Sequence, residues 1–158
     1  MENIERLVKI LKEKGYHLVT AESATCGLIA SEFGNISGVS KVYSGGVVVY
    51  TSDAKQKLLN INSQLINKYG TISHEIANEM VISITNILNC ECGISVTGNA
   101  GPTAIENKPV GLFYIGLKVN EYIIVKKIQL DEMLSRNMMR ANVANIAIQE
   151  MLNILENN

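Results

Sequence analysis

Lys55 is the residue whose position first suggests chemistry. It lies in the first turn of a predicted helix over residues 53–59, where its charge would face the positive end of the helix dipole. A positive side chain at this position is electrostatically unfavourable, and residues that break such local rules tend to be functional. A lysine shielded from water there would have a lowered pKa and serve as a neutral base. Ser40 ends a flexible loop and Tyr50 ends a predicted strand, so the three side chains could meet at one rim. Taken singly, each is better explained by an ordinary role, as a surface lysine, a loop serine and a core tyrosine.

The segment Glu22–Gly27 suggests a second kind of chemistry, the binding of an anion. Its small and hydroxyl-bearing residues, including Ser23, Thr25 and Gly27, precede a predicted helix over residues 28–33. N–H groups exposed at a helix start, together with the positive end of the dipole, attract phosphate. Simple N-capping by Ser23 or Thr25 is the alternative, and the residue types alone favour it slightly.

A third candidate is the loop over residues 97–111, which follows a predicted buried strand. Both prolines of the chain, Pro102 and Pro109, fall in this loop. Gly98 and Gly101 permit a close approach of the backbone to a ligand. A long loop of this kind is more often functional than not, and a rigid connection is the alternative.

Several familiar signatures are missing. The sequence contains no G-x-G-x-x-G, G-x-x-x-x-G-K-[ST], H-E-x-x-H or G-x-S-x-G motif. Cys90-Glu91-Cys92 has no second Cys/His pair to complete four ligands, and His17 and His74 are far apart, so we expect no metal and no cofactor. An odd number of cysteines without a paired framework is typical of reduced thiols, which predicts a cytoplasmic location.

Composition narrows the class of protein further. A chain of 158 residues with 47% hydrophobic and 18% charged residues predicts a single domain over residues 1–158 with a substantial core. The net charge of −1 and an aromatic content of 5% argue against nucleic-acid binding. Residues 1–14 are amphipathic and charged, unlike a signal peptide, and no apolar run is long enough to cross a membrane.

The predicted elements place the three candidate regions on one fold. Hydrophobic periodicity predicts helices over residues 2–14, 28–33, 53–59, 61–69, 73–88 and 133–155, and strands over 17–21, 43–50, 93–96, 111–119 and 122–128. We expect Val47–Val49 to be buried on both faces. Helices and strands alternate up to residue 100, and a hairpin then precedes the last helix. This order predicts a three-layer α/β/α fold with a mixed, mostly parallel central sheet.

Four motifs taken together resemble the CinA C-terminal domain family. The family motif AESCTGGL is matched by Ala21-Glu22-Ser23 with Thr25 and Gly27-Leu28, and GGVVTYSNEAK is matched by Gly45–Tyr50 with Ala54-Lys55. The motif VTGIAGP resembles Val96–Pro102, and KPVG resembles Lys108–Gly111. Arg136 and Arg140 resemble the GDR-x-x-x-R start of the family's last helix. The likeness runs in order from about residue 5 to residue 155, with close to the family's spacings.

The resemblance implies an activity as well as a fold. Stand-alone PncC-like members are nicotinamide-nucleotide amidases, usually homodimers, which hydrolyse the carboxamide of nicotinamide mononucleotide to nicotinic acid mononucleotide and ammonia without a metal or cofactor. The implied mechanism is a serine–lysine dyad whose nucleophile falls on Ser40 and whose general base falls on Lys55, with Tyr50 beside it. The positions that bind or orient the nucleotide fall on Ser23, Thr25, Gly27, Thr97, Gly98 and Arg136.

The sequence also departs from the family pattern. Ala24-Thr25-Cys26-Gly27 stands where the family has Cys-Thr-Gly-Gly, and Ser52 replaces an asparagine. The family aspartate before Arg136 is absent, and the loop Thr103–Asn107 is shorter and lacks the family's glycines. Two alternatives therefore accompany the amidase prediction: a nucleotide-binding or interaction domain without catalysis, and an amidohydrolase for another small amide.

Overall fold

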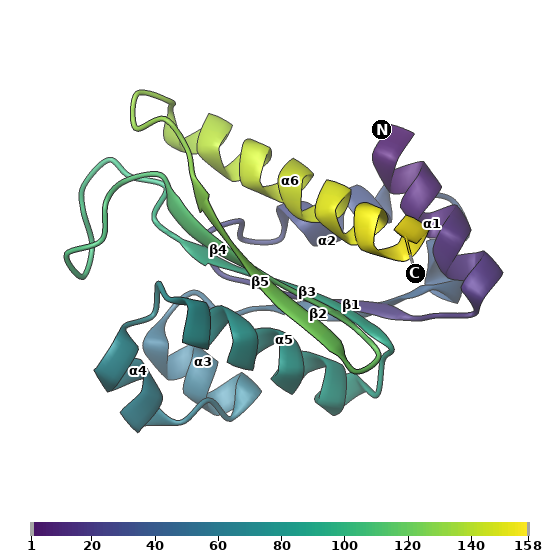
Figure 1. The fold of residues 1–158 in the computed structure, drawn as a ribbon, viewed down its shortest axis with the longest axis horizontal. Helices are drawn as coiled ribbons and strands as arrows, with labels where there is room; N and C mark the ends of the chain where they lie inside the picture. Colours follow the sequence, from purple (N-terminus) through teal and green to yellow (C-terminus); the bar gives the residue numbers. More distant parts are fainter. Residues whose placement is uncertain (1, 158) are drawn as a thin grey trace.

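A five-stranded sheet lies at the centre of the computed structural model, which describes residues 2–157 (Figure 1). Its strands are β1 (Leu18–Glu22), β2 (Tyr43–Val48), β3 (Cys92–Gly98), β4 (Leu112–Val119) and β5 (Tyr122–Gln129), in the spatial order β2-β1-β3-β4-β5. β1 pairs in parallel with β2 and β3, whereas β4 is antiparallel to both β3 and β5. Four strands therefore share one direction, which confirms the mixed sheet, although half of the strand pairings are antiparallel.

Helices cover both faces of this sheet, as the α/β/α prediction required (Figure 1). The helices are α1 (Glu2–Lys14), α2 (Leu28–Gly34), α3 (Ser52–Leu59), α4 (Ser63–Tyr69), α5 (His74–Leu88) and α6 (Arg136–Asn157), with a short 3-10 turn, η1, at Val39–Lys41. Figure 1 shows α1, α2 and α6 on one face and α3, α4 and α5 on the other. Within residues 2–157, no helix combines the length and the apolar character needed to cross a bilayer.

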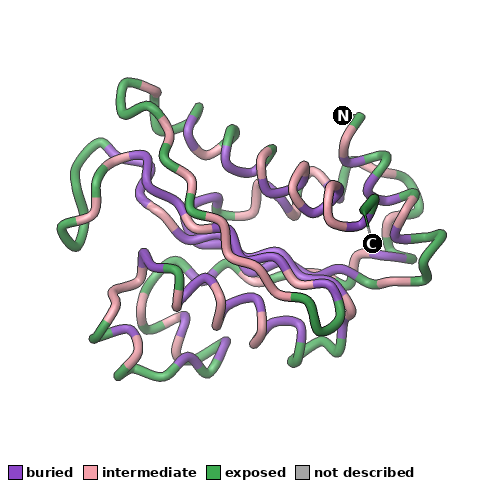
Figure 2. The backbone as a smooth tube through the Cα atoms, in the orientation of Figure 1, coloured by how far each residue is buried: buried purple, intermediate pink, exposed green. Residues whose placement is uncertain are grey.

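The two faces of the sheet bury separate hydrophobic cores (Figure 2). Successive side chains of a strand point to opposite faces, so in β1 Leu18 joins the core under α1 and α6, whereas Val19 and Ala21 join the core over α5. The central strands are therefore buried on both sides, and every residue of β1 is buried. Burial on both sides is the reason why apolar residues of β1 point to both faces of the sheet instead of alternating with exposed polar residues.

The structure corrects two details of the predicted elements. Val47–Val49 are not all buried, because β2 is an edge strand: Val48 is 44% exposed, and only Val49, beyond the strand, is fully buried. The last helix begins at Arg136 rather than Met133. The residues before it form a turn in which the side chain of Asp131 accepts a hydrogen bond from the N–H of Met133 at 2.9 Å.

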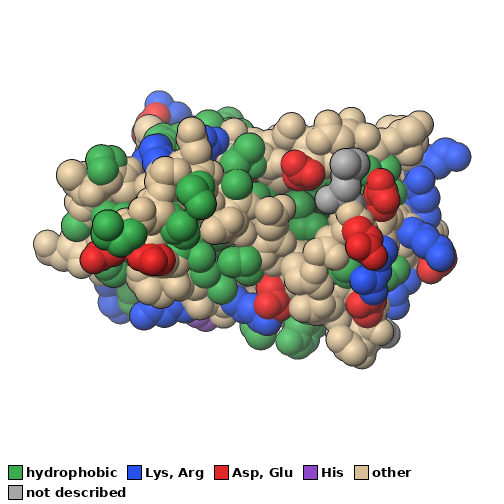
Figure 3. Space-filling model, turned by 90° about the horizontal axis from the view of Figure 1, so that it is seen from above, with side chains coloured by type: hydrophobic (Ala, Val, Ile, Leu, Met, Phe, Trp, Pro, Cys, Tyr) green, Lys and Arg blue, Asp and Glu red, His purple; other side chains and the backbone are tan. Residues whose placement is uncertain are grey.

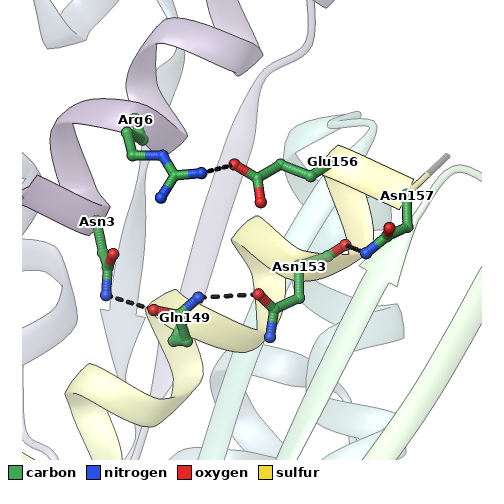
Figure 4. A network of polar contacts seen from close by, with 6 residues as sticks. All are labelled: Asn3, Arg6, Gln149, Asn153, Glu156 and Asn157. Carbon is green, nitrogen blue, oxygen red and sulfur yellow. Dashed lines mark hydrogen bonds and ion pairs between the residues drawn. The ribbon is translucent and has the colours of Figure 1, made fainter.

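The first and last helices, α1 and α6, are joined by polar contacts on their side of the sheet (Figure 4). Arg6 of α1 forms an ion pair with Glu156 of α6, and Asn3 donates to Gln149. In the view onto this layer, acidic and basic side chains lie interspersed toward the end that carries the N-terminus (Figure 3). The opposite end of α6, with the exposed Met138 and the preceding Met133, lies beside the loops that follow β3 and β5.

Candidate active site

The residues predicted to do chemistry gather, with one exception, at the carboxyl ends of β1, β2 and β3. A pocket of about 150 Å³ opens there, as expected for an open α/β sheet. Its lining includes Ser23, Tyr50, Thr71, Thr97, Ile105 and Arg136. These residues come from five separate segments of the chain, so the fold alone brings them together.

Lys55 is the most unusual group at this end of the sheet. Its side chain is only 1% exposed, and its Nζ lies 3.0 Å from Ser23 Oγ and 2.8 Å from the carbonyl oxygen of Val49. Ser23 follows β1 and Val49 follows β2, so the amine bridges the ends of two paired strands. The position in the first turn of α3 is as predicted, because Thr51 accepts a hydrogen bond from the N–H of Ala54 and caps the helix.

Burial changes the acid–base behaviour of this lysine. Loss of water around the amine lowers the pKa of Lys55 from 10.5 to about 8, and the carboxylate of Glu106 opposes part of that shift. Roughly one molecule in ten is then uncharged at pH 7. A neutral amine has two N–H bonds and one lone pair, so it can donate to Val49 and accept the hydroxyl proton of Ser23. The pair has the geometry of a nucleophile beside its base.

Ser40, predicted as the nucleophile, is not part of this pair. It lies exposed in η1, directly before β2, whereas Lys55 lies beyond the end of that strand. Six extended residues at about 3.3 Å each separate the two positions by roughly 20 Å. The serine that contacts Lys55 is Ser23, to which the family resemblance assigns a role in substrate binding. A signal for this was present in the sequence: Ser23 follows a buried strand, where ligands bind, and Ser40 precedes one.

Tyr50 and Arg136 form the open side of the pocket. Arg136 donates through one nitrogen to the Tyr50 hydroxyl at 2.5 Å and through another to the carbonyl of Gly101 at 2.6 Å. This arginine begins α6, so it links the loop after β2 to the loop after β3. Its guanidinium supplies a positive charge at the mouth of the pocket, where the side chain of Tyr50 is half exposed.

Arg140, one turn further along α6, holds the backbone next to Ser23. Its Nε donates to the carbonyl of Ala24, and another nitrogen donates to the carbonyl of Thr25, each at 3.0 Å. The amide N–H of Ala24 has no hydrogen-bond partner among the described residues, and Ala24 lines the pocket. The sequence placed Arg140 in a family motif but did not indicate this contact, which depends on how α6 packs over the β1 loop.

The predicted anion site at the start of α2 is occupied by the protein itself. Glu22, only 1% exposed, accepts hydrogen bonds from the N–H groups of Gly27 at 3.0 Å, Ile29 at 3.2 Å and Ala30 at 2.9 Å. Gly27 is therefore committed to helix capping rather than to a phosphate. Thr25 is fully buried, and its hydroxyl has no hydrogen-bond partner among the described residues.

Thr97 and Gly98 both line the pocket, but both also make contacts that stabilise the fold. The Thr97 hydroxyl donates to the carbonyl of Thr71 at 2.7 Å, which fixes the segment before α5. A Cβ at Gly98 would lie 2.1 Å from the ring of Phe113 on the paired strand β4. The close approach that glycine permits here is therefore to an aromatic ring of the core.

Candidate metal ligands do not cluster in the described part of the chain. No group of three or more His, Cys, Asp or Glu side chains within residues 2–157 is placed to hold a metal ion. Cys26 is exposed, whereas Cys90 and Cys92 are buried, and none of the three forms a disulfide. Burial raises the pKa of Cys92 to about 12, which leaves this thiol protonated.

Comparison with known proteins agrees with the resemblance seen in the sequence. The family model for the CinA C-terminal domain matches residues 2–155. A CinA-like protein of Kosmotoga olearia is 42% identical over 149 residues, covering 93% of this chain and 36% of that protein. The chain therefore spans about a third of the length of the curated relatives that it matches.

Solved structures show the same fold. The competence/damage inducible protein CihA from Agrobacterium tumefaciens is 30% identical, with a TM-score of 0.91 over 98% of this chain and 94% of that one. A CinA superfamily protein from Klebsiella pneumoniae is 22% identical, with a TM-score of 0.95 over 99% of this chain and 98% of that one. The second likeness bears on the fold alone.

The lowered pKa of Lys55 predicts a pH-dependent stability. Above pH 8 the folded state loses this proton while the unfolded state keeps it until about pH 10.5, so stability rises with pH across that interval. We expect the free energy of unfolding of the wild type, relative to Lys55→Met, to rise by about 3 kcal/mol between pH 7 and pH 11. Urea unfolding at several pH values measures this difference, and a constant difference would contradict the lowered pKa.

Glu22 predicts a second effect on stability. Glu22→Ala leaves three backbone N–H groups at the start of α2 without their acceptor, and we expect it to lower the free energy of unfolding by about 3–5 kcal/mol. Glu121→Ala, in the exposed turn between β4 and β5, is the matched control, and we expect a change within about 0.5 kcal/mol. Urea unfolding of both variants at neutral pH measures the two effects. Equal losses would show that Glu22 does not cap α2.

Proposed function

Because this chain belongs to the CinA C-terminal domain family, we propose that it is an amidohydrolase in which Ser23 and Lys55 form the serine–lysine dyad. The 3.0 Å contact between Lys55 Nζ and Ser23 Oγ, at a buried amine of lowered pKa, is the observation that carries the proposal. The proposed substrate is nicotinamide mononucleotide, hydrolysed to nicotinic acid mononucleotide and ammonia in the cytoplasm. The substrate, a homodimeric assembly and the location rest on the resemblance to stand-alone members.

The first half of the reaction forms an acyl-enzyme. Neutral Lys55 takes the proton of the Ser23 hydroxyl as Ser23 Oγ attacks the carboxamide carbon. The negative charge that develops on the carboxamide oxygen is stabilised by the unpartnered N–H of Ala24, held in place by Arg140. The Lys55 ammonium then gives its proton to the leaving nitrogen, and the carbon–nitrogen bond breaks to release ammonia.

The second half returns the enzyme to its starting state. Lys55, neutral again, takes a proton from a water molecule as the water oxygen attacks the acyl carbon and forms a tetrahedral intermediate. The proton then returns from Lys55 to Ser23 Oγ as the ester bond breaks, which releases the carboxylic acid product. All these proton transfers use one amine, and no step needs a metal ion or a second acid.

The volumes beside Ser23 support a nucleotide that extends out of the pocket. The pocket of about 150 Å³ is smaller than the roughly 300–1,000 Å³ of typical ligand sites, so it accommodates the pyridine carboxamide alone. An adjoining hollow of about 350 Å³ shares Ala100 and Arg136 with it. Ribose and phosphate would lie in this hollow on the side of Arg136, whose guanidinium pairs with phosphate, and away from the carboxylate of Glu132.

Ammonia release from nicotinamide mononucleotide tests the dyad. We expect Ser23→Ala and Lys55→Ala each to lower kcat by about 10³-fold or more, whereas Ser40→Ala, the matched control, stays within about twofold of wild type. We also expect turnover to continue after treatment with a chelator. Loss of activity in Ser40→Ala but not in Ser23→Ala would contradict the assignment.

The wild-type protein also distinguishes the alternatives. Saturable nucleotide binding by a folded protein without ammonia release would identify a binding domain. Faster turnover of another amide, in a panel that includes nicotinamide and nicotinamide riboside, would identify a different substrate. Either result would overturn the proposed reaction.

The same dyad predicts the pH profile of the reaction. Only the neutral form of Lys55 accepts the proton of Ser23, so we expect kcat to rise with pH and to level off above the lysine pKa of about 8. Initial rates at saturating substrate between pH 6 and pH 9.5 measure this dependence. A rate that falls over this interval would exclude Lys55 as the general base.

A further inference from the structure

A tight turn in the loop after β3 has an unusual backbone conformation. Glu106 and Asn107 are both left-handed, with φ of 54° and 57°, and the turn is closed by hydrogen bonds between Ile105 and Lys108 in both directions. Asparagine tolerates this conformation well, but glutamate does so rarely. The energetic cost at Glu106 indicates that the surrounding structure holds it there.

The contacts of Glu106 explain what holds it. Its carboxylate accepts hydrogen bonds from the N–H of Thr71 at 3.1 Å, the hydroxyl of Thr71 at 2.6 Å and the N–H of Ile72 at 3.3 Å. Burial raises the pKa of Glu106, but these hydrogen bonds and the nearby Lys108 outweigh that effect and lower the pKa below its usual value. The acceptor therefore stays ionised at neutral pH.

Lys108, at the other end of the turn, is fastened to the same segment. Its Nζ donates to the carbonyl of Ile72 at 2.7 Å and to that of Tyr69 at 3.4 Å. The fit is close, because a Cβ at Gly70 would lie 2.3 Å from Glu106 Oε2. Two side chains of opposite charge thus clamp the turn onto the segment that connects α4 and α5.

The clamped turn forms part of the wall of the pocket that contains Ser23. Thr71, Ile72 and Ile105 all line this pocket, and Thr71 is fixed from the other side by the hydroxyl of Thr97. Ile105 is 48% exposed, which leaves an apolar side chain uncovered at the pocket. A flat aromatic carboxamide would cover it on binding.

We propose that the Ile105–Lys108 turn is a wall of the pocket that the contacts of Glu106 with Thr71 and Ile72 hold in place; we call these contacts the latch. Glu106 is then a positioning residue, and Ile105 supplies the apolar surface that selects planar aromatic carboxamides. This inference rests on the proposed function, because it names the part of the substrate that the Ser23 pocket recognises. The latch itself is a property of the unliganded protein, and it can be tested without any turnover.

The first experiment measures the latch by amide hydrogen exchange in the free protein. We expect Glu106→Ala to speed exchange in the peptide that contains Thr71 and Ile72 by about tenfold or more, because their N–H groups lose their acceptor. Glu121→Ala, which removes an exposed carboxylate at the distant β4–β5 turn, should exchange there as the wild type does. Wild-type exchange in Glu106→Ala would overturn the latch.

The second experiment separates binding from chemistry with nicotinamide mononucleotide at pH 9.5, where Lys55 is neutral. We expect Ile105→Ala and Glu106→Ala to raise KM by about fivefold to tenfold and to keep kcat within about twofold, since the reacting groups are intact. Ile105→Val preserves the apolar surface and should keep KM within about twofold. A fall in kcat at unchanged KM, or an unchanged KM in Ile105→Ala, would overturn the role in selection.

The two experiments separate failure of this inference from failure of the proposed function. If the wild type releases no ammonia, the proposed reaction and the selectivity at Ile105 both fall, while exchange at Thr71 and Ile72 still decides the latch. If the wild type is active and exchange is unaffected by Glu106→Ala, the latch alone is overturned.

Discussion

The buried amine of Lys55 is the constraint on which the rest of the site depends. An ammonium group taken out of water is costly, and this one is tolerated because Val49 and Ser23 offer it oxygen atoms and because it gives up its proton readily. Those oxygen atoms lie together because β1 and β2 pair in parallel and end at the same level, with Glu22 opposite Val48. The parallel pairing of β1 and β2 therefore determines where the buried amine of Lys55 can lie.

Polar groups at this end of the sheet divide into those that the fold uses and those that it leaves free. Glu22 caps α2, the Thr97 hydroxyl holds Thr71, and Arg140 is occupied by two carbonyls. Buried polar groups need such partners, so their presence beside a pocket is poor evidence of substrate binding. Beside them lie the Ser23 hydroxyl with the Lys55 amine and the unpartnered N–H of Ala24, which the proposed mechanism uses as nucleophile, base and oxyanion donor.

The sequence predicted the elements and one half of the proposed Ser23–Lys55 dyad, for identifiable reasons. Periodicity predicts the helices, and Lys55 could be found because it violates the preference of a helix start for negative charge. The partner of Lys55 could not be found in the same way, because Ser23 and Ser40 differ only in which end of a strand they occupy. Once that difference is considered, the general rule for α/β sheets favours Ser23. The contacts of Arg140 and Glu106 depend on packing between distant segments, which no local pattern encodes.

Preorganisation connects these contacts to the proposed chemistry. Arg140 fixes the backbone that presents the N–H of Ala24, Glu22 fixes the helix that follows, and Glu106 fixes the opposite wall. Each loop around Ser23 is therefore tied to a neighbouring element by a charged side chain that makes two or more hydrogen bonds. Groups held in this way need little rearrangement when charge develops in a transition state, which is the condition under which backbone dipoles are most effective. A small domain with a small pocket can meet that condition because its charged residues brace the loops from outside the pocket.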